Sequence, residues 1–360
     1  MKLVVLGLSL SSSWGNGHAT TFRALLSAFA AHGHEVLFLE RDQPWYAAHR
    51  DLPDPDYCRL AYYDSLSGLE EWSTEVISAD AVMVGSYVPQ GVEVSRWVQR
   101  TARGVTCFYD IDTPVTLAKL ARGDHEYVSP EVIPGFDIYF SFTGGPTLTR
   151  LEQDFGAPAA RPLYCSVDAQ VYQPRDLPKR WDLTYLGTYS ADRQPTLEKL
   201  LLEPARALPN RSFCVAGPQY PEQIAWPDNV ERLDHVPPAD HPAFYAQSRA
   251  TLNVTRADMI AAGWSPSVRL FEAAACATPV ISDRWNGIEE LFSPGDAIVL
   301  AESARDVISA LNRDLRPVGE AARQVILSAH TAAHRAATLE AELLSAKDGA
   351  AGRRSEAVSC

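Results

Sequence analysis

The sequence predicts an α/β protein that contains two doubly wound parallel-sheet domains. Three observations predict it. The 360 residues suffice for two domains of about 150 residues, short continuous apolar runs alternate with amphipathic segments, and this alternation restarts after a proline-rich stretch. Continuous apolar runs are typical of strands that are buried on both faces of a parallel sheet.

The first series of elements begins at the amino terminus. An apolar run at residues 3–8 predicts a buried strand, and apolar residues at helical spacing from Phe22 to Phe29, closed by Gly33, predict a helix. Residues 35–39 form the next expected strand, which completes a βαβ unit. Further strands are expected at 81–85, 105–109 and 137–140, with a helix over 146–155.

The second series follows a segment with three prolines between residues 160 and 180. We expect an N-terminal domain at 1–165, a linker at 166–180 and a C-terminal domain at 181–330. Within the C-terminal domain we expect strands at 183–186, 212–215, 250–254 and 279–281, helices over 196–208 and 268–276, and a short helix around Phe244. A C-terminal helix at 331–346 and a disordered tail at 347–360 complete the prediction.

Composition and charge limit the class of protein. Hydrophobic residues make up 46% and charged residues 21%, which is typical of a packed globular chain. The net charge, 32 − 45 = −13, opposes binding to nucleic acids and to anionic membranes. Six widely spaced cysteines without a Cys-x-x-Cys pair suggest reduced thiols, and no segment resembles a signal peptide or a membrane anchor. We therefore expect a cytoplasmic protein; the sequence does not predict its oligomeric state.

A small, polar loop follows the first predicted strand and leads directly into a helix. Asn16 and Gly17 in this loop favour a site that offers backbone N–H groups to an anion or a sugar, although a serine-rich connector is an alternative. The glycine spacing fits a dinucleotide-binding motif badly, because Thr20 stands where the third glycine belongs. Glu40, at the end of the second strand, is the one residue that suits such a motif.

Three candidate catalytic residues belong to the first domain. His18 lies at a helix start, where a neutral imidazole can act as a base or simply cap the helix. Asp110 and Asp112 follow a predicted strand, and we expect Asp110 to accept a hydrogen bond from a substrate hydroxyl. A divalent-metal pair and helix capping are the alternatives. With no third ligand in view, we expect no essential metal. The other paired histidines, His32 with His34 and His330 with His334, are expected at the surface.

In the second domain, candidate binding residues lie at the ends of predicted strands and helices. Gly187 ends a predicted strand and Arg193 lies beside the next helix start, where a guanidinium suits a diphosphate; an ordinary surface arginine is the alternative. Glu272 stands among apolar residues of a helix. Because a buried carboxylate needs hydrogen bonds, we expect it to face a polar ligand, for which a ribose diol is the fitting partner.

A family resemblance rests on three stretches. Arg269-Leu-Phe-Glu-Ala-Ala-Ala-Cys-Ala-Thr-Pro-Val-Ile-Ser-Asp283, followed by Gly287-Ile-Glu-Glu-Leu-Phe-Ser-Pro-Gly295, resembles the sugar-nucleotide signature of GT-B glycosyltransferases. It is most similar to the CgeB-like spore-maturation branch of the retaining group 1 enzymes. Gly17-His-Ala-Thr-Thr with Ala31-His-Gly-His-Glu-Val36 resembles the first βαβ unit of GT-B enzymes, and His330-Thr with Arg335 resembles the closing helix.

This resemblance implies two Rossmann-like domains that face a cleft. It implies a nucleotide-diphosphosugar held by the second domain, a small-molecule or glycan acceptor held by the first, and no cofactor or essential metal. Glu272 would bind the ribose hydroxyls and Arg193 the diphosphate. Ser265, Ser267 and Arg269 would contact the phosphates or the donor sugar. Retaining relatives often carry a second glutamate eight positions before the first, where this chain has Trp264.

The sequence thus predicts a glycosyltransferase that uses a nucleotide sugar, with retention of configuration. Three alternatives stay open: a sugar-nucleotide 2-epimerase of the same fold, a non-catalytic sugar-nucleotide-binding protein, and, more distantly, a nicotinamide-dependent oxidoreductase. The donor base, the donor sugar and the acceptor are not determined by the sequence.

Overall fold

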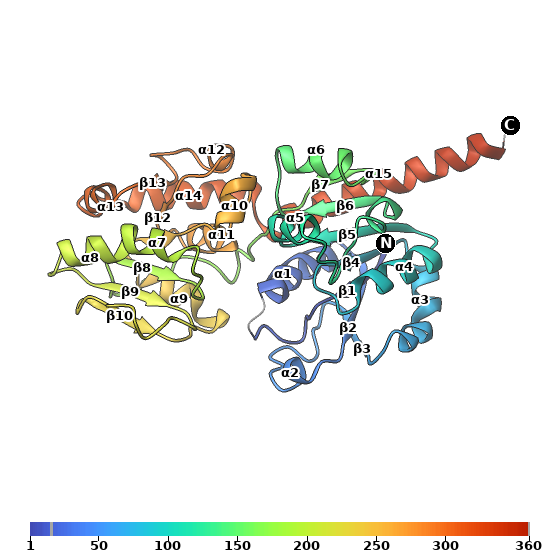
Figure 1. Ribbon diagram of the computed structural model, residues 1–360, viewed down its shortest axis with the longest axis horizontal. Coiled ribbons are helices and arrows are strands. Elements are labelled where there is room, and N and C mark those ends of the chain that lie inside the picture. Colours follow the sequence, from blue (N-terminus) through green and yellow to red (C-terminus); the bar gives the residue numbers. More distant parts are fainter. Residues whose placement is uncertain (15–16, 359–360) are drawn as a thin grey trace. The chain divides into compact units, whose positions relative to one another are not determined.

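The computed structural model describes residues 1–14 and 17–358 and divides into two compact units (Figure 1). The first unit comprises Met1 to Cys165 together with the chain from Ala332 onward, and the second comprises Ser166–Thr331. Each unit contains one sheet, all of whose strands pair in parallel, with helices on both faces. The predicted α/β fold with two doubly wound sheets is confirmed.

The sheet of the first unit has seven strands in the order β3-β2-β1-β4-β5-β6-β7. Its strands are β1 (Lys2–Gly7), β2 (Glu35–Arg41), β3 (Arg59–Tyr63), β4 (Ala81–Gly85), β5 (Val105–Asp110), β6 (Ile138–Ser141) and β7 (Ala160–Pro162). Its helices are α1 (Gly17–Ala31), α2 (Pro44–Ala47), α3 (Ser73–Ser78), α4 (Gly91–Thr101), α5 (Thr113–Ala121), α6 (Pro146–Gln153) and α15 (Ala332–Val358), with short 3₁₀ turns at Ser67–Trp72 and Ile133–Gly135.

Helices bury both faces of this sheet, as the continuous apolar strands require. Val4 and Leu6 of β1 belong to the core that is shared with α3 and α4. On the other face, the ring of Phe22 from α1 meets the rings of Phe38 and Tyr109 edge to face at 5.5 and 5.8 Å between centroids. Strands buried on both faces leave only their ends and loops to contact ligands.

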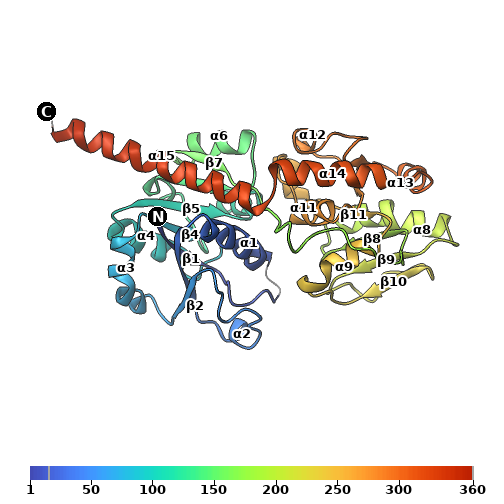
Figure 2. The same cartoon turned by 180° about the vertical axis from the view of Figure 1, so that it is seen from behind.

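The last helix, α15, packs along α1 on the first unit (Figure 2). Ala336, Leu339 and Leu343 of α15 are fully or almost fully buried. The Nε of Arg335 donates to the carbonyl oxygen of Tyr164 at 3.1 Å. The carboxyl-terminal helix is therefore part of the first unit's core, although it follows the second unit in sequence.

The sheet of the second unit has six strands in the order β10-β9-β8-β11-β12-β13. They are β8 (Leu183–Leu186), β9 (Phe213–Ala216), β10 (Val230–Leu233), β11 (Thr251–Asn253), β12 (Val280–Ser282) and β13 (Val299–Leu300). The helices are α7 (Gln194–Leu197), α8 (Glu203–Ala207), α9 (His241–Ala246), α10 (Ala257–Ala262), α11 (Val268–Ala275), α12 (Ile288–Leu291), α13 (Ala304–Leu311) and α14 (Arg316–Ala329), with a π-helical turn at Glu198–Leu202 and a 3₁₀ turn at Pro238–Asp240.

The structure assigns two segments differently from the domain limits predicted from the sequence. Residues 166–180, expected as a linker, belong to the second unit, where Tyr172 is 6% exposed and the Nζ of Lys179 donates to two backbone carbonyl groups. The helix expected at 331–346 continues as α15 to Val358, across most of the expected tail.

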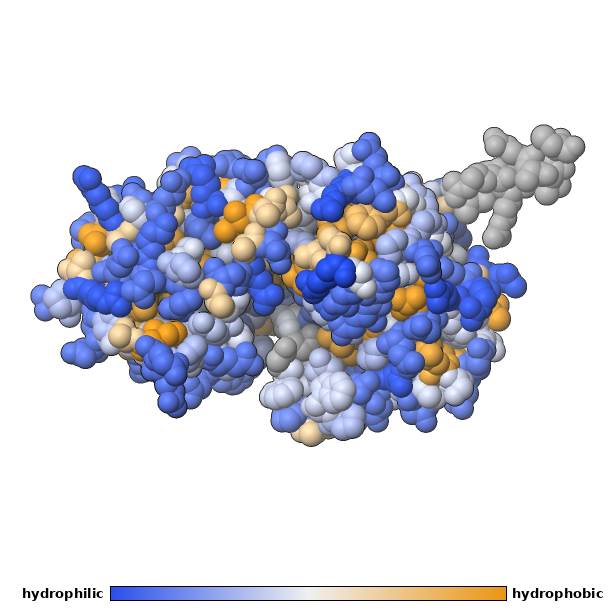
Figure 3. Space-filling view, viewed as in Figure 1, coloured by the Kyte–Doolittle hydropathy of each residue, from blue (hydrophilic) through white to orange (hydrophobic). Residues whose placement is uncertain are grey.

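The surface is mainly polar. On the face drawn in Figure 3, hydrophilic side chains surround several small hydrophobic patches. Among the described residues, every helix is too short or too polar to cross a membrane. Of the described cysteines, Cys58 is partly buried, the other four are buried, and all five are free thiols.

Candidate functional site

Each sheet has one position where the order of its strands reverses. In the first unit this position lies between β1 and β4, and in the second it lies between β8 and β11. Open parallel sheets bind their ligands outside the carboxyl ends of the strands at such a switch point. These two edges are therefore the candidate binding positions, one in each unit.

Arg269 occupies the switch point of the second unit. Its Nε donates to the carbonyl oxygen of Leu186 at the end of β8, and its Nη1 donates to the Oδ1 of Asn253 at the end of β11, at 3.3 Å. The guanidinium lies over the ring of Tyr185, 5.2 Å from the centroid. A Cβ atom on Gly187 would stand 2.9 Å from Nη2 of Arg269, so glycine leaves the room that the guanidinium needs.

Arg193 adds a second guanidinium to this edge. Its side chain is buried, at 8% exposure, and its Nη2 donates to the carbonyl oxygen of Thr188 at 2.6 Å. Within residues 1–14 and 17–358, its Nε has no hydrogen-bond partner. Burial lowers the pKa of Arg193, and the positive charges of Arg269 and Arg256 lower it further. The buried Arg193 and the partly buried Arg269 create a positive site that an anion would stabilise.

The loop before α11 shapes the same edge. The Oγ of Ser267 caps α11 by accepting a hydrogen bond from the backbone N–H of Arg269 at 3.3 Å, and the buried Ser265 donates to the carbonyl oxygen of Gly263 at 2.8 Å. Trp264 has a left-handed backbone, with φ of 43°, and packs on Gly287, where a Cβ would clash with the indole at 2.5 Å. A strained tryptophan thus stands where the resemblance would place a carboxylate.

Glu272 of α11 is buried, at 4% exposure, and already has polar partners. The hydroxyl of Tyr172 donates to Oε1 at 3.0 Å, and the hydroxyl of Tyr245 donates to Oε2 at 3.2 Å. The Nδ1 of His241 lies 3.5 Å from Oε2. Burial and the Glu272 charge raise the pKa of both tyrosines, which keeps them protonated as donors. Because a carboxylate offers about four lone-pair positions, Glu272 retains capacity for a further donor.

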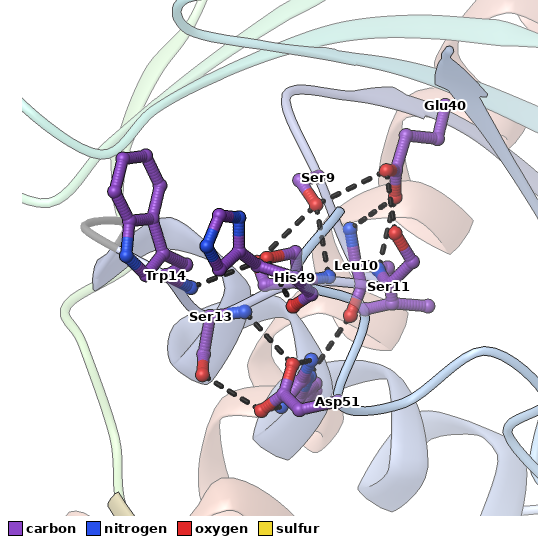
Figure 4. A network of polar contacts seen from close by, with 10 residues as sticks. Ser9, Leu10, Ser11, Ser13, Trp14, Glu40, His49 and Asp51 are labelled. Carbon is purple, nitrogen blue, oxygen red and sulfur yellow. Dashed lines mark hydrogen bonds and ion pairs between the residues drawn. The ribbon is translucent and has the colours of Figure 1, made fainter. Parts of the chain in front are cut away.

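At the corresponding edge of the first unit, the loop after β1 is held from within by a carboxylate (Figure 4). Glu40 is fully buried at the end of β2. Its Oε2 accepts hydrogen bonds from the backbone N–H groups of Leu10 and Ser11 at 2.7 and 2.9 Å, and its Oε1 accepts from the hydroxyls of Ser9 and Ser11 at 3.1 and 2.7 Å. Glu40 is therefore committed to the loop and does not face the ribose of a dinucleotide.

A second carboxylate, Asp51, fixes the outer part of this loop (Figure 4). It accepts hydrogen bonds from the backbone N–H and the hydroxyl of Ser13 at 2.9 and 2.7 Å, and Arg23 forms a two-pronged ion pair with it at 3.0 and 2.7 Å. Burial alone would raise the pKa of Asp51, but these bonds outweigh it and hold the pKa far below its usual range. Beyond Trp14, which stacks on His49, the predicted residue Asn16 lies outside the described residues.

His18 lies in the first turn of α1, one residue after the exposed Gly17, and is 8% exposed. Its Nε2 lies 3.4 Å from the Oδ2 of Asp112, and its ring meets the ring of Tyr87 edge to face at 5.3 Å. Tyr87 follows β4 in a left-handed conformation, with φ of 62°. The switch point of the first unit thus brings together a histidine, a carboxylate and an aromatic ring.

Asp110 lies in a buried environment and not at a surface where a substrate could contact it. It is fully buried and accepts hydrogen bonds from the hydroxyls of Tyr139 and Thr116 at 2.7 and 2.8 Å and from the backbone N–H of Asp112 at 3.1 Å. Burial raises the pKa of Asp110 to about 6. The expectation that Asp110 accepts a hydrogen bond from a substrate hydroxyl is therefore corrected. The carboxylate that reaches the surface is Asp112, whose side chain is 37% exposed, and the buried Asp110 stabilises the loop through its hydrogen bond from the Asp112 backbone.

Several residues near these two edges were not predicted from the sequence. Tyr172 and Tyr245 lie 100 and 27 positions from Glu272, and nothing local in the sequence connects them to it. Asn253 gave a usable signal, because it is a polar residue at the carboxyl end of an apolar strand. Tyr87 gave none, since tyrosine after a buried strand is common in cores.

The comparisons with known proteins agree with this geometry. Residues 193–341 match a family model described as glycosyl transferase-like. The match covers less than half of the chain, so it shows that this segment is similar to that family. The matched region contains Arg193 and Arg269, which lie at the switch point of the second unit, and Glu272 of α11. No curated protein sequence matches the chain.

Solved structures establish the GT-B fold of the whole chain. Sucrose-phosphate synthase from Thermosynechococcus elongatus is 15% identical, with a TM-score of 0.68 over 96% of this chain and 100% of that chain. Anabaena HepE in complex with UDP-glucose is 13% identical, with a TM-score of 0.69 over 96% and 100%. A glycosyltransferase from Rickettsia africae is 12% identical, with a TM-score of 0.67 over 96% and 98%. Identities this low establish the glycosyltransferase fold alone.

Proposed function

We propose that this protein is a glycosyltransferase that moves a sugar from a nucleotide-diphosphosugar to an acceptor hydroxyl. The observation that carries the proposal is the pair of guanidinium groups, the buried Arg193 and the partly buried Arg269, at the switch point of the second unit and within the segment 193–341 that matches the glycosyl transferase-like model. A solved structure with the same fold contains UDP-glucose, which has the kind of diphosphate that this pair suits.

The donor is proposed to bind at the second unit. Arg193 and Arg269 would hold the diphosphate, and Ser267 at the start of α11 would lie beside it. Glu272 would accept hydrogen bonds from the ribose hydroxyls, with Tyr172 and Tyr245 fixing the orientation of its carboxylate. Gly187 would allow the close approach of the phosphates to the end of β8.

In the transfer step, the bond between the anomeric carbon and the diphosphate oxygen breaks, and a bond from that carbon to the acceptor oxygen forms. Negative charge then develops on the diphosphate. Two guanidinium groups fixed by hydrogen bonds to the ends of β8 and its loop would stabilise this charge without rearrangement. For a retaining reaction, the proton of the acceptor hydroxyl passes to the leaving diphosphate, so that the enzyme needs no separate base.

The acceptor is proposed to bind at the first unit, beside His18, Asp112 and Tyr87. We propose retention, because the 265–295 segment resembles retaining enzymes, and we place the chain nearest the CgeB-like branch on the same residues. His18 would then position the acceptor instead of removing its proton. We further propose that no metal ion takes part, since the arginines supply the positive charge for the diphosphate.

The test is the release of nucleoside diphosphate from a panel of nucleotide sugars, with and without a panel of sugar and small-molecule acceptors. Acceptor-dependent release together with a new glycoside in the mass spectrum is the expected result. Binding without release would identify a sugar-nucleotide-binding protein. Conversion of the donor to its 2-epimer without glycoside formation would identify an epimerase.

A further inference from the structure

Three side chains that can ligate a metal ion converge on the first unit, away from the residues discussed above. His32 and His34 belong to the turn between α1 and β2, and Glu340 belongs to α15. The Nδ1 of His32 lies 3.0 Å from Oε2 of Glu340, and the Nε2 of His34 lies 3.1 Å from Oε1. One ligating atom from each of the three residues lies within 4.8 Å of the other two.

The turn presents both imidazoles to the same helix. Gly33 adopts a left-handed conformation, with φ of 85°, which glycine allows without strain and which reverses the chain between the two histidines. His34 is not at the surface as the sequence suggested: its side chain is 10% exposed and its ring packs against Phe29 at 4.3 Å. Its Nδ1 lies 3.1 Å from the amino group of Met1, and its Nε2 faces Glu340. Binding of a metal ion through Nε2 needs the tautomer with its proton on Nδ1, so the amino group must then give up this contact as a donor.

The third residue sits on a rigid support. The preceding residue of α15, Leu339, is fully buried, and α15 packs along α1 through this region. The ion pair between Lys347 and Asp80, at 2.6 Å, holds a later turn of the helix to the same unit. Glu340 therefore keeps its place opposite the α1–β2 turn without help from the histidines, so that the three side chains are arranged before any ion binds.

The donor set defines the class of ion. Imidazole nitrogens favour Zn²⁺ and its neighbours among the transition metals over Mg²⁺ and Ca²⁺, which prefer oxygen ligands. Around a tetrahedral Zn²⁺ with ligands at 2.0–2.1 Å, neighbouring ligand atoms stand roughly 3.3 Å apart. The two histidine nitrogens lie 3.0 and 3.1 Å from different oxygens of Glu340, and one ligand atom from each residue can be chosen so that all three lie within 4.8 Å of one another; side-chain rotations must bring them to about 3.3 Å. Two histidines and a carboxylate leave the fourth position for water.

We propose that His32, His34 and Glu340 bind one Zn²⁺ ion that fastens α15 to the first unit. The ion would replace two histidine–glutamate contacts with three coordinate bonds that join the α1–β2 turn to the last helix. The site lies at the start of β2, whereas Glu40 and the candidate acceptor site lie at the carboxyl ends of the strands. The ion is therefore assigned a structural role, and the proposal does not depend on the proposed transfer reaction.

The test is calorimetric titration of ZnCl₂ into the full chain without a histidine tag, with MgCl₂ as a comparison. One Zn²⁺ per chain is expected, with no comparable Mg²⁺ binding. His32→Ala and Glu340→Gln should each weaken Zn²⁺ binding by at least about tenfold, the lower bound of what loss of an outer-shell partner costs. His125→Ala, which removes an exposed imidazole of the same unit, should leave binding unchanged.

Thermal unfolding supplies a readout that does not depend on calorimetry. Zn²⁺ should raise the melting temperature of the wild-type chain and of His125→Ala, and this rise should be lost in His32→Ala and Glu340→Gln, because an ion that binds only the folded state stabilises it. Both variants change residues at the surface end of the cluster, so their folding without Zn²⁺ can be verified by circular dichroism. Absence of Zn²⁺ binding, or binding that neither variant weakens, would overturn the proposal.

Discussion

The switch-point edges of the two units have the same architecture and opposite chemistry. In the second unit, Arg193 and Arg269 gather at the ends of β8 and β11. In the first unit, the corresponding loops carry Glu40, Asp110 and Asp112. The parallel sheet determines where a ligand can bind, and a few loop side chains determine which ligand it is. Under the proposed function, the second edge binds an anionic diphosphate and the first binds a neutral hydroxyl compound.

The two edges also differ in how completely their charges are paired. Glu40 and Asp110 accept hydrogen bonds from their own loops and are fully buried, so they serve as internal supports. Arg193 is also buried, yet its Nε has no partner among the described residues. A buried polar atom without a partner costs about 1–3 kcal/mol, which a ligand can recover. This contrast leads to four predictions.

The largest effect is expected from Asp110→Asn, which tests the internal support of the first edge. The pKa of Asp110 is raised from 3.8 to about 6, so the folded state favours the protonated carboxyl. The stability that this provides is complete below about pH 4 and is lost as the pH rises through about 6. The loss amounts to roughly 3 kcal/mol. Asn cannot titrate and should remove this part of the decline.

Urea denaturation of both proteins between pH 4 and 7 measures the difference. The free energy of unfolding of the wild-type chain should fall relative to that of Asp110→Asn across this range. Parallel pH profiles would show that Asp110 ionises at its usual pKa and is not the buried support described here.

Arg193→Ala tests the positive edge of the second unit. Loss of a charge-assisted hydrogen bond should weaken the binding of a nucleoside diphosphate by about 1.5–3 kcal/mol, on the order of 10- to 150-fold in Kd. Binding of the bare nucleoside should change little. Arg206→Ala, which removes an exposed arginine of α8, is the matched control. Equal losses for the nucleotide and the nucleoside would contradict the role of Arg193.

Glu272→Ala tests the ribose contact of the same unit, with an expected loss of about 1–3 kcal/mol in nucleotide binding. Glu272→Gln should have a milder effect, because the amide oxygen can still accept a hydrogen bond. Tyr172→Phe removes one donor to Glu272 and serves to separate orientation of the carboxylate from contact with the ligand. Unchanged nucleotide affinity in a folded Glu272→Ala variant would make this residue a purely structural partner of its tyrosines.

The smallest effect is expected from His18→Ala, which tests the first edge. Under retention, His18 positions the acceptor, so the rate should fall by less than about tenfold and donor affinity should not change. A catalytic base would instead contribute about 10²–10⁴-fold. A loss of that size, together with an inverted linkage in the proton NMR spectrum of the first product, would make His18 the base of an inverting enzyme.

Much of the fold could be predicted from the sequence, and the strands that were missed have a common physical cause. The predicted strand at 81–85 coincides with β4, and that at 183–186 coincides with β8. The four strands without a prediction, β3, β7, β10 and β13, are the edge strands of the two sheets. An edge strand is short and partly exposed, so it lacks the continuous apolar run that marks a central strand.

The candidate site could be predicted less completely, because its geometry depends on contacts between distant segments. The charge and position of Arg193 and Glu272 suggested ligand contacts, but the tyrosines that hold Glu272 could not be found from local spacing. Asp110 and Asp112 are two positions apart, and the spacing alone does not show that Asp110 is the one enclosed by Tyr139 and Thr116. His32 and Glu340 are 308 positions apart and meet only because α15 returns to the first unit.

The most direct test of the central claim is a thermal-shift comparison of nucleoside diphosphates, the matching nucleosides and NAD on the wild-type chain. A ligand at 100 times its Kd adds about 2.7 kcal/mol to the stability of the folded state. We predict that at least one nucleoside diphosphate raises the melting temperature, that its nucleoside does so far less at equal concentration, and that Arg193→Ala abolishes the difference. Stabilisation by NAD with no response to any nucleoside diphosphate would contradict the proposed glycosyltransferase.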